Sequence, residues 1–365
     1  MEIISDGIRN GKIPFPYQHL FLESPEIMFQ RLKEYKPIIK KYNGKLHGYY
    51  PKFSIYKSNS YKIVQDKTHY WKMNVLSDMF NENVRLDGKP IYYDFTGNEA
   101  WIQLSDEIAE DYYQSPELSN AIVNYLEKGV PLQPEHYQQM SDLFFHKIRL
   151  PTIFKLGWAV GILSHLFSNL ENIKWLDISA GYGDRLLVAC SHNMIYHGYD
   201  PNIDLEKGHD EIIAKFGDKE KQIIKYEPFE DAVLDYKNYD IIFTSPPFYI
   251  LETYSNLSNQ SIIKYPEFDS WMINFLFKSI QKAWNSLKIG GYLALHISDT
   301  TYYQICEPMN LFIEDLPGSW FVEIFGVMSK NPTYKPQPVW IWEKTDNIQV
   351  SAGRLGKLYP QYLIK

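Results

Sequence analysis

The sequence predicts an α/β protein built on a doubly wound, mostly parallel sheet. From residue 172 onward, short apolar segments of strand length alternate with longer segments in which apolar residues recur every three to four positions. Glycines or polar residues end several of these segments, as they do at the ends of helices and strands. Strands that are separated by helices form a parallel sheet with helices on both faces.

The alternation begins with a strand that runs directly into a glycine turn. In chain order, the predicted elements are a strand at 173–179, a helix at 184–192, a strand at 194–200, a helix at 205–217, and strands at 222–228 and 239–245. Residues 268–288 keep apolar residues at helical spacing, and this helix is predicted to end at Gly290 and Gly291. A strand at 292–298 follows.

The last part of the sheet is predicted to be antiparallel. Two strand-like segments, 320–330 and 338–344, flank a proline-rich loop, and we expect them to form a hairpin at the sheet edge. The α/β domain is predicted to cover residues 141–346. Residues 347–365 are predicted to form a C-terminal tail.

Residues 1–140 differ in character and are predicted to form an α-rich or mixed extension, a candidate for nucleic-acid recognition. Between Gln30 and Val75 the chain has eleven Lys or Arg residues but only two acidic residues, whereas the whole chain has a net charge of −7. Aromatic residues interleaved with cations are typical of surfaces that bind phosphates by charge and bases by stacking. A solvated basic face over an aromatic core explains the pattern equally well. The aromatic residues are Tyr35, Tyr42, Tyr49, Tyr50, Phe53, Tyr56, Tyr61, Tyr70 and Trp71.

The composition argues against several classes of protein. Cys190 and Cys306 are too few for a disulfide framework, and no Cys/His cluster has the spacing of a metal site. The N-terminus lacks a basic segment followed by an apolar run, and no segment is long and apolar enough to span a membrane. We therefore expect a cytoplasmic protein with reduced cysteines, no metal and no membrane association.

The most informative segment is Ser245-Pro246-Pro247-Phe248, at the end of the strand at 239–245. Consecutive prolines fix φ and have no N–H, so Ser245 Oγ and the Pro246 carbonyl stay available as acceptors for an NH2 group. The ring of Phe248 offers a flat face on which a base can stack. The segment is suited to hold the exocyclic amine of a nucleobase.

A second motif follows the first strand of the sheet. Gly181 and Gly183 let the backbone turn sharply and approach a ligand closely. Asp200 ends the second strand, nineteen residues after Gly181, where an acid can accept hydrogen bonds from both ribose hydroxyls. Leu186 occupies the third glycine position of a dinucleotide fingerprint, and Asp184 adds negative charge where a pyrophosphate would bind. These features favour S-adenosylmethionine (SAM) over NAD.

Together with YHGYDPN at 196–202 and FED at 229–231, the two motifs resemble those of the SAM-dependent amino-group DNA methyltransferases, which act on adenine N6 or cytosine N4. The sequence is most similar to orphan methylases of phages and large DNA viruses, which have a similar TSPP segment. The similarity covers residues 144–344 and extends to residues 75–85. It implies a seven-stranded Rossmann-like methyltransferase fold, DNA as the partner, and a cytoplasmic location, in the host cell if the protein is viral. A dimer or a second subunit is compatible with it.

The resemblance also implies roles for individual residues. Ser245, Pro246, Pro247 and Phe248 correspond to the catalytic segment. The SAM-binding positions correspond to Asp177, Ser179, Ala180, Gly181, Gly183, Asp184 and Arg185 in the first loop, to Asp200, Pro201 and Asn202, to Glu230 or Asp231, and to Thr152 or Lys155 before the first strand. Tyr249, Tyr254, Tyr334 and Lys335 are expected to line the path of the substrate base.

Two departures from the family pattern leave the target base open. The catalytic segment begins with Ser245 in place of Asp or Asn, and it ends with Phe248 in place of the commoner Tyr. Two other functions remain open as well. One is an RNA amino-methyltransferase acting on rRNA, tRNA or an mRNA cap, since base amines occur in both nucleic acids. The other is a catalytically silent nucleic-acid-binding subunit.

Overall fold

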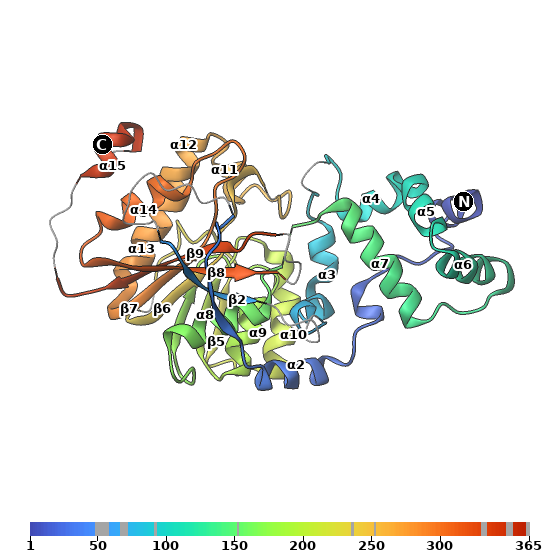
Figure 1. The fold of residues 1–365 in the computed structure, drawn as a ribbon, viewed down its shortest axis with the longest axis horizontal. Coiled ribbons are helices and arrows are strands. Elements are labelled where there is room, and N and C mark those ends of the chain that lie inside the picture. Colours follow the sequence, from blue (N-terminus) through green and yellow to red (C-terminus); the bar gives the residue numbers. More distant parts are fainter. Residues whose placement is uncertain are drawn as a thin grey trace.

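The computed structural model describes residues 1–47, 58–65, 72–90, 93–151, 153–234, 237–251, 253–329, 334–347 and 353–362. Within these residues, a central sheet with helices on both faces lies beside a smaller group of helices (Figure 1). The described sheet has nine strands in the order β1-β2-β8-β9-β7-β6-β3-β4-β5. In chain order they are β1 (Ile39–Tyr42), β2 (Tyr61–Gln65), β3 (Lys174–Asp177), β4 (Ile195–Tyr199), β5 (Gln222–Lys225), β6 (Tyr239–Thr244), β7 (Leu287–His296), β8 (Ser319–Met328) and β9 (Gln337–Lys344).

The strand order confirms the predicted doubly wound fold. The strands from β3 to β7 are parallel to one another, and their chain order reverses between β3 and β6. β9 lies antiparallel between β7 and β8. The seven strands from β3 onward thus form the mostly parallel sheet of the Rossmann-like methyltransferase fold. The reversal creates a switch point, which is where ligands bind in open α/β sheets.

The sheet differs from the prediction beyond β9. β8 and β9 form the expected antiparallel pair, but β8 is not an edge strand, because β2 pairs with it in parallel. Ile63 and Val64 of β2 are fully buried, and β1 pairs with β2 on the outer side. The N-terminal region, predicted as an extension of the fold, therefore supplies two strands of the sheet itself.

The long helix predicted over residues 268–288 is present, but it ends before the glycine pair. It comprises α12 (Phe268–Ser270), a π-helical segment (Trp271–Phe277) and α13 (Lys278–Ser286), and β7 begins at the next residue. Gly290, with a φ of 77°, lies inside β7, near the end of the strand at which the pairing with β6 shifts in register. The glycine therefore permits an irregularity in the strand and does not end the helix.

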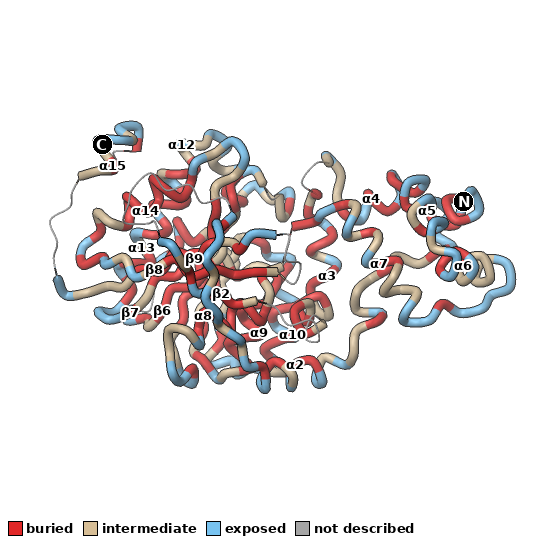
Figure 2. Tube along the Cα trace, in the orientation of Figure 1, coloured by how far each residue is buried: buried red, intermediate tan, exposed pale blue. Residues whose placement is uncertain are grey.

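Helices cover the two faces of the sheet with separate apolar clusters. On one face, α13 and α14 bury Trp284 and Met309. On the other face, α2, α8, α9 and α10 bury side chains such as Leu32, Leu186 and Ile212. Figure 2 shows that buried residues follow the sheet and the helices packed on it. These helices are α2 (Pro25–Glu34), α8 (Leu156–Leu166), α9 (Asp184–Ser191), α10 (Glu206–Phe216) and α14 (Cys306–Glu314).

The smaller group of helices has a hydrophobic core of its own, in which Trp101, Tyr112 and Phe144 are buried. α3 (Asp78–Leu86) lies between this group and the sheet domain (Figure 1). Residues 1–140 are therefore divided between two cores, because α2 and β2 pack with the sheet. The helices of the smaller group are α1 (Glu2–Arg9), α4 (Gly97–Gln103), α5 (Ser105–Tyr113), α6 (Pro116–Lys128) and α7 (Pro134–Ile148).

The aromatic residues of the basic segment are described only in part. Tyr35 and Tyr61 are buried, and Tyr42 packs against the core of the sheet domain. The other six lie outside the described residues, so their predicted contact with nucleic acid stays a prediction. The remaining short helices are Gln18–Leu20, Lys72–Val75, Ile203–Leu205, Tyr249–Leu251, α11 (Ser261–Lys264), α15 (Arg354–Leu358) and Pro360–Tyr362.

Candidate active site

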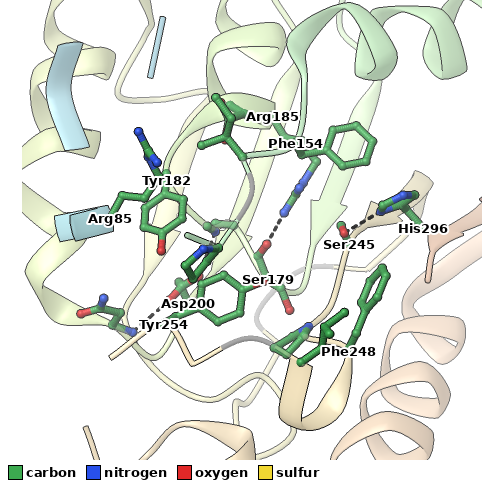
Figure 3. Close-up of a pocket in the computed structure, with 18 of the residues that line it drawn as sticks. Arg85, Phe154, Ser179, Tyr182, Arg185, Asp200, Ser245, Phe248, Tyr254 and His296 are labelled. Atoms are coloured by element: carbon green, nitrogen blue, oxygen red, sulfur yellow. Dashed lines mark hydrogen bonds between the residues drawn. The ribbon is translucent and has the colours of Figure 1, made fainter. Parts of the chain in front are cut away.

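A cavity of about 750 Å³ opens at the carboxyl ends of the parallel strands, beside the switch point of the sheet. Ser179 and Gly181 line it after β3, and Ser245 and Phe248 line it after β6. Because β3 and β6 are neighbouring parallel strands, the two sequence motifs lie next to each other at the carboxyl ends of these strands. Figure 3 shows side chains from both motifs around this space. Its volume is typical of a site for a small ligand or cofactor.

The glycine loop is shaped by its two glycines and by Asp200. Gly181 and Gly183 have φ angles of 62° and 97°, in the region that favours glycine. A Cβ on Gly183 would lie 2.8 Å from the Ile212 side chain, so this residue is fixed by packing against α10. Gly183 precedes α9 and does not line the cavity, whereas Gly181 lines it.

Asp200 follows β4 and stabilises the glycine loop through hydrogen bonds. Its Oδ2 accepts a hydrogen bond from the Gly181 N–H at 2.8 Å, and its Oδ1 accepts one from the Asn202 N–H at 3.0 Å. Burial raises the pKa of Asp200 to about 6, although both N–H groups favour the charged form. Each oxygen retains a lone pair, so the carboxylate can still accept from a pair of hydroxyls in the cavity.

Asp177 lies beneath the loop and does not line the cavity, contrary to its expected contact with the cofactor. Its Oδ2 accepts hydrogen bonds from Arg185 Nε at 2.6 Å and from the Tyr196 hydroxyl at 2.8 Å. Arg185 also donates to the Ser179 carbonyl (Figure 3). The pair is fully buried, so it holds the shape of the loop rather than presenting a free charge.

α3 packs on the same loop from the N-terminal region. Ser77 Oγ donates to Asp184 Oδ1 at 2.5 Å, and Asn81 Nδ2 donates to the Tyr182 carbonyl at 2.9 Å. Asp184 lines the cavity, but burial raises its pKa to about 7. This carboxyl is therefore only partly ionised at neutral pH and is a weaker source of negative charge than the sequence suggested.

Of the two acids that follow β5, only Glu230 lines the cavity. Its side chain is buried, and its Oε1 accepts a hydrogen bond from Lys264 Nζ at 2.9 Å. Asp231 points to the surface, where it pairs with Lys264 and with Lys278. Glu230 is therefore the candidate for a contact with an adenine amino group.

The Ser-Pro-Pro-Phe segment borders the cavity through three of its four residues. Ser245, Pro247 and Phe248 line the cavity, whereas Pro246 is buried and does not. Tyr249, which follows them, has a φ of 57°, a conformation that bulky residues rarely adopt. Ser245 Oγ is therefore the acceptor that this segment presents to a ligand, and the role of the Pro246 carbonyl stays a prediction.

Some of the other predicted site residues line the cavity, and others do not. Tyr249 does not line the cavity; its hydroxyl donates to the Pro266 carbonyl at 2.5 Å, and its ring packs on Trp271 and Tyr303. Thr152 lies outside the described residues. The predicted residues that do line the cavity, besides those above, are Ala180, Arg185, Pro201, Asn202, Lys155, Tyr254, Tyr334 and Lys335.

Several lining residues carried no sequence signal of their own. His296, at the end of β7, lies 2.8 Å from Ser245 Oγ through its Nδ1 and 2.8 Å from Gln337 Oε1 through its Nε2. Behind the cavity, His209 Nε2 bonds the Gly181 carbonyl at 2.9 Å and supports the glycine loop from α10. These residues come from different strands and helices, so only the fold brings them together. Other lining residues of this kind include Arg85, Phe145, Phe154, Trp158 and Asn259.

The cavity has an acidic part and a cationic part. We call the part of the lining formed by Asp184, Asp200 and Glu230 the acidic part. Other lining residues are cationic or carry imidazole groups, namely His47, Arg85, His146, Arg149, Lys155, Arg185, His296 and Lys335. Arg149 and Lys335 are exposed to solvent. The acidic part suits a ligand that carries positive charge, and the exposed cations suit a polyanion.

No family model matches the sequence, and no curated protein matches it. Solved structures with partial similarity include a SAM-dependent O-methyltransferase from Thermotoga maritima, at 17% identity and a TM-score of 0.37, which covers 56% of this chain and 71% of that chain. TrmN from Thermus thermophilus matches at 13% identity and a TM-score of 0.38, over 66% and 78% of the two chains. Magnesium protoporphyrin IX methyltransferase from Synechocystis, solved with bound SAM, matches at 12% identity and 0.38, over 66% and 96%. Because these TM-scores lie below 0.5, the fold class rests on the strand order described above.

Among the described residues, no group of three or more His, Cys, Asp or Glu side chains is arranged to hold a metal ion. Within the same residues, no helix is both long enough and apolar enough to cross a membrane.

Proposed function

We propose that this protein is a SAM-dependent methyltransferase that modifies the exocyclic amino group of a base in DNA, at adenine N6 or cytosine N4. The observation that carries the proposal is the shared cavity, in which the glycine loop and the Ser-Pro-Pro-Phe segment border one space. A methyl donor and an amine acceptor must lie within contact distance for an in-line displacement. Two motifs on neighbouring strands at a switch point meet that requirement.

The residues around the acidic part fit SAM better than a phosphorylated cofactor. In this proposal Asp200, which lines the cavity, accepts hydrogen bonds from the ribose hydroxyls, and Glu230, which also lines it, contacts the adenine amino group. When bound, SAM supplies an electrophilic methyl group on a positively charged sulfur. Asp200, which is mostly charged at neutral pH, would repel a pyrophosphate, whereas it attracts the sulfonium and ammonium groups. These features support SAM over NAD.

Ser245 and Phe248 are the residues proposed to bind the base that receives the methyl group. The nitrogen of a base amine is a poor nucleophile, because its lone pair is delocalised into the ring. Ser245 Oγ can accept a hydrogen bond from this NH2 group, and that bond strengthens as positive charge develops on the nitrogen. Phe248 lines the cavity and offers a ring face against which an extruded base can stack.

The distribution of charge supports a nucleic acid as the substrate. Arg149, Lys155 and Lys335 surround the cavity and can contact phosphates on either side of an extruded nucleotide. Residues 93–148, which include the helices α4 to α7, carry ten acidic residues but only two lysines. A nucleic acid is therefore expected to bind on the side of the cavity and to avoid the outer surface of these helices.

A labelled-cofactor assay tests the proposal. The protein is incubated with methyl-labelled SAM and, in parallel, with duplex DNA, single-stranded DNA and total RNA, which are then hydrolysed to nucleosides. We expect label in N6-methyladenine or N4-methylcytosine from DNA. Label confined to RNA would identify an RNA amino-methyltransferase. Binding of SAM and DNA without any transfer would identify a silent subunit, and absence of SAM binding would overturn the proposal.

Variants of the catalytic segment provide the first prediction. Ser245→Ala is expected to lower turnover, and the triple variant that adds Pro246→Gly and Phe248→Ala is expected to reduce it more than 100-fold, because the base amine is then neither bonded nor stacked. SAM affinity, measured by calorimetry, should stay unchanged. Tyr302→Ala is a suitable control, because this aromatic side chain is 85% exposed and does not line the cavity. Unchanged turnover in the triple variant would remove the segment from the mechanism.

A further inference from the structure

Three side chains from neighbouring strands form a chain of hydrogen bonds that ends at the cavity. Ser245 follows β6, His296 ends β7, and Gln337 begins β9. His296 Nδ1 lies 2.8 Å from Ser245 Oγ, and His296 Nε2 lies 2.8 Å from Gln337 Oε1. Figure 3 shows the Ser245 hydroxyl and the His296 ring directed toward each other. The order of these strands in the sheet places the three residues side by side.

The direction of these bonds follows from the chemistry of the amide. Gln337 Oε1 is only an acceptor, so His296 Nε2 must carry the ring proton and donate it. In the neutral ring, Nδ1 then has a lone pair and accepts the proton of the Ser245 hydroxyl. With its proton engaged there, Ser245 Oγ has only lone pairs to offer to the cavity.

The surroundings of His296 keep the ring neutral. The residue is 6% exposed, and its ring packs against Phe154, Trp158 and Phe248, with centroid distances of 5.1, 6.4 and 5.6 Å. Burial lowers the pKa of His296 to about 4, and the charge of Arg185 acts in the same direction. The lone pair on Nδ1 is therefore retained at neutral pH.

We propose that His296 and Gln337 are positioning residues that orient the Ser245 hydroxyl as a pure hydrogen-bond acceptor for the substrate amine. This inference rests on the proposed function, because it assigns the NH2 group to Ser245. It also explains how a serine serves where related enzymes have Asp or Asn. A carboxylate or amide oxygen carries no proton, whereas a hydroxyl proton aimed at the cavity would oppose an NH2 donor. Because the Ser245 hydroxyl donates its proton in a hydrogen bond to His296, that proton points away from the substrate.

Kinetics of paired substitutions test the coupling between the residues. His296→Phe is expected to lower kcat by 10- to 100-fold with unchanged SAM affinity, because the hydroxyl loses its acceptor. His296→Asn, whose Oδ1 takes the place of Nδ1, should restore kcat to within about threefold of wild type. His165→Phe is the matched control, because this histidine is also largely buried but does not line the cavity. Equal losses in His296→Phe and His296→Asn would overturn the proposal.

The double variant shows whether His296 acts through Ser245. If it does, Ser245→Ala combined with His296→Phe should be no slower than Ser245→Ala alone. Multiplied losses would mean that His296 acts independently, which contradicts the proposal. At the other end of the chain, Gln337→Met removes the acceptor for His296 Nε2 and should lower activity about tenfold.

A readout that does not depend on turnover separates this inference from the proposed function. In protein labelled with 15N-histidine, NMR correlation spectra distinguish the two neutral tautomers, and the His296→Asn variant identifies the His296 signals. We expect a neutral ring protonated on Nε2 from pH 6 to pH 8. A ring protonated on Nδ1, or a charged ring, would overturn the inference even if DNA is methylated. The expected tautomer in a protein that methylates nothing would contradict the proposed function alone.

Discussion

Asp200 combines a structural and a binding task in one carboxylate. It accepts hydrogen bonds from the Gly181 and Asn202 N–H groups, and it lines the cavity. Charged acceptors form stronger hydrogen bonds than neutral ones, so ionisation of Asp200 should control how tightly ribose hydroxyls bind. Because burial raises the pKa of Asp200 to about 6, this control lies within an accessible pH range.

The second prediction concerns this pH dependence. A carboxyl group with a pKa near 6 is charged at pH 7.5, but only about one tenth ionised at pH 5. We expect the Kd for SAM, measured by calorimetry, to rise about tenfold as the pH falls from 7.5 to 5. Asp200→Asn should weaken binding by one to two orders of magnitude at pH 7.5 and remove the pH dependence.

Asp184 is the control for this measurement, because burial raises its pKa to about 7 and it lines the same cavity. If Asp200 is responsible, the Asp184→Asn variant should keep the change in Kd between pH 7.5 and pH 5. Loss of the pH dependence in Asp184→Asn, with its retention in Asp200→Asn, would reverse the two assignments.

At the scale of elements, the end of α7 combines a strained backbone with a cation beside the cavity. Arg149 follows the last residue of the helix with a φ of 43° and a ψ of 62°, the left-handed conformation in which glycine usually ends helices. The side chain is exposed and lines the cavity. An arginine in this position costs stability relative to glycine, which fits a role in binding.

The third prediction separates the two effects at this position. Arg149→Gly is expected to raise the free energy of unfolding by up to about 1 kcal/mol, because the left-handed conformation is no longer strained. The same change should weaken DNA binding and reduce the slope of log K against log salt by about one, because one phosphate contact is lost. Arg149→Lys should keep the slope. Unchanged salt dependence in Arg149→Gly would place the nucleic acid elsewhere.

Elements with a local signal could be predicted from the sequence, whereas contacts between distant elements could not. The strands predicted at 173–179 and 239–245 and the glycine turn follow from periodicity and turn residues, and the structure has β3 and β6 within those ranges. The pairing of Ser245 with His296 depends on which strands are neighbours, and nothing in the segment around His296 specifies this. Gly290 misled the prediction, because a left-handed glycine fits a strand irregularity as well as a helix end.

At the scale of the whole molecule, the N-terminal region is part of the sheet domain as well as of the helical group. The sequence indicated a change of character near residue 140, since the alternation of strands and helices begins only beyond it. It could not show that β2 pairs with β8, because a short apolar strand carries no information about its partner. Ile63 of β2 is fully buried against Gly326 of β8.

The fourth prediction tests whether β2 is an integral strand. Ile63→Asp should lower the free energy of unfolding by more than about 3 kcal/mol and promote aggregation, because it buries an unpaired charge and uncovers the edge of β8. Lys62→Gln, at the neighbouring exposed position, should change it by less than about 1 kcal/mol, because only a surface ion pair with Glu323 is lost. Thermal unfolding and gel filtration measure both effects. Similar stability of the two variants would show that β2 is dispensable.

The pairing of β2 with β8 has a consequence for the order in which the nascent chain folds. Lys62 pairs with Phe325, and Gln65 pairs with Met328. During synthesis, β2 leaves the ribosome long before β8 has been made. Its apolar side chains therefore stay exposed, and its backbone groups stay unpaired with β8, until almost the entire polypeptide has been synthesised. The helical group, whose core draws on residues between Ile4 and Leu150, can close much earlier and shield that end of the molecule while translation continues.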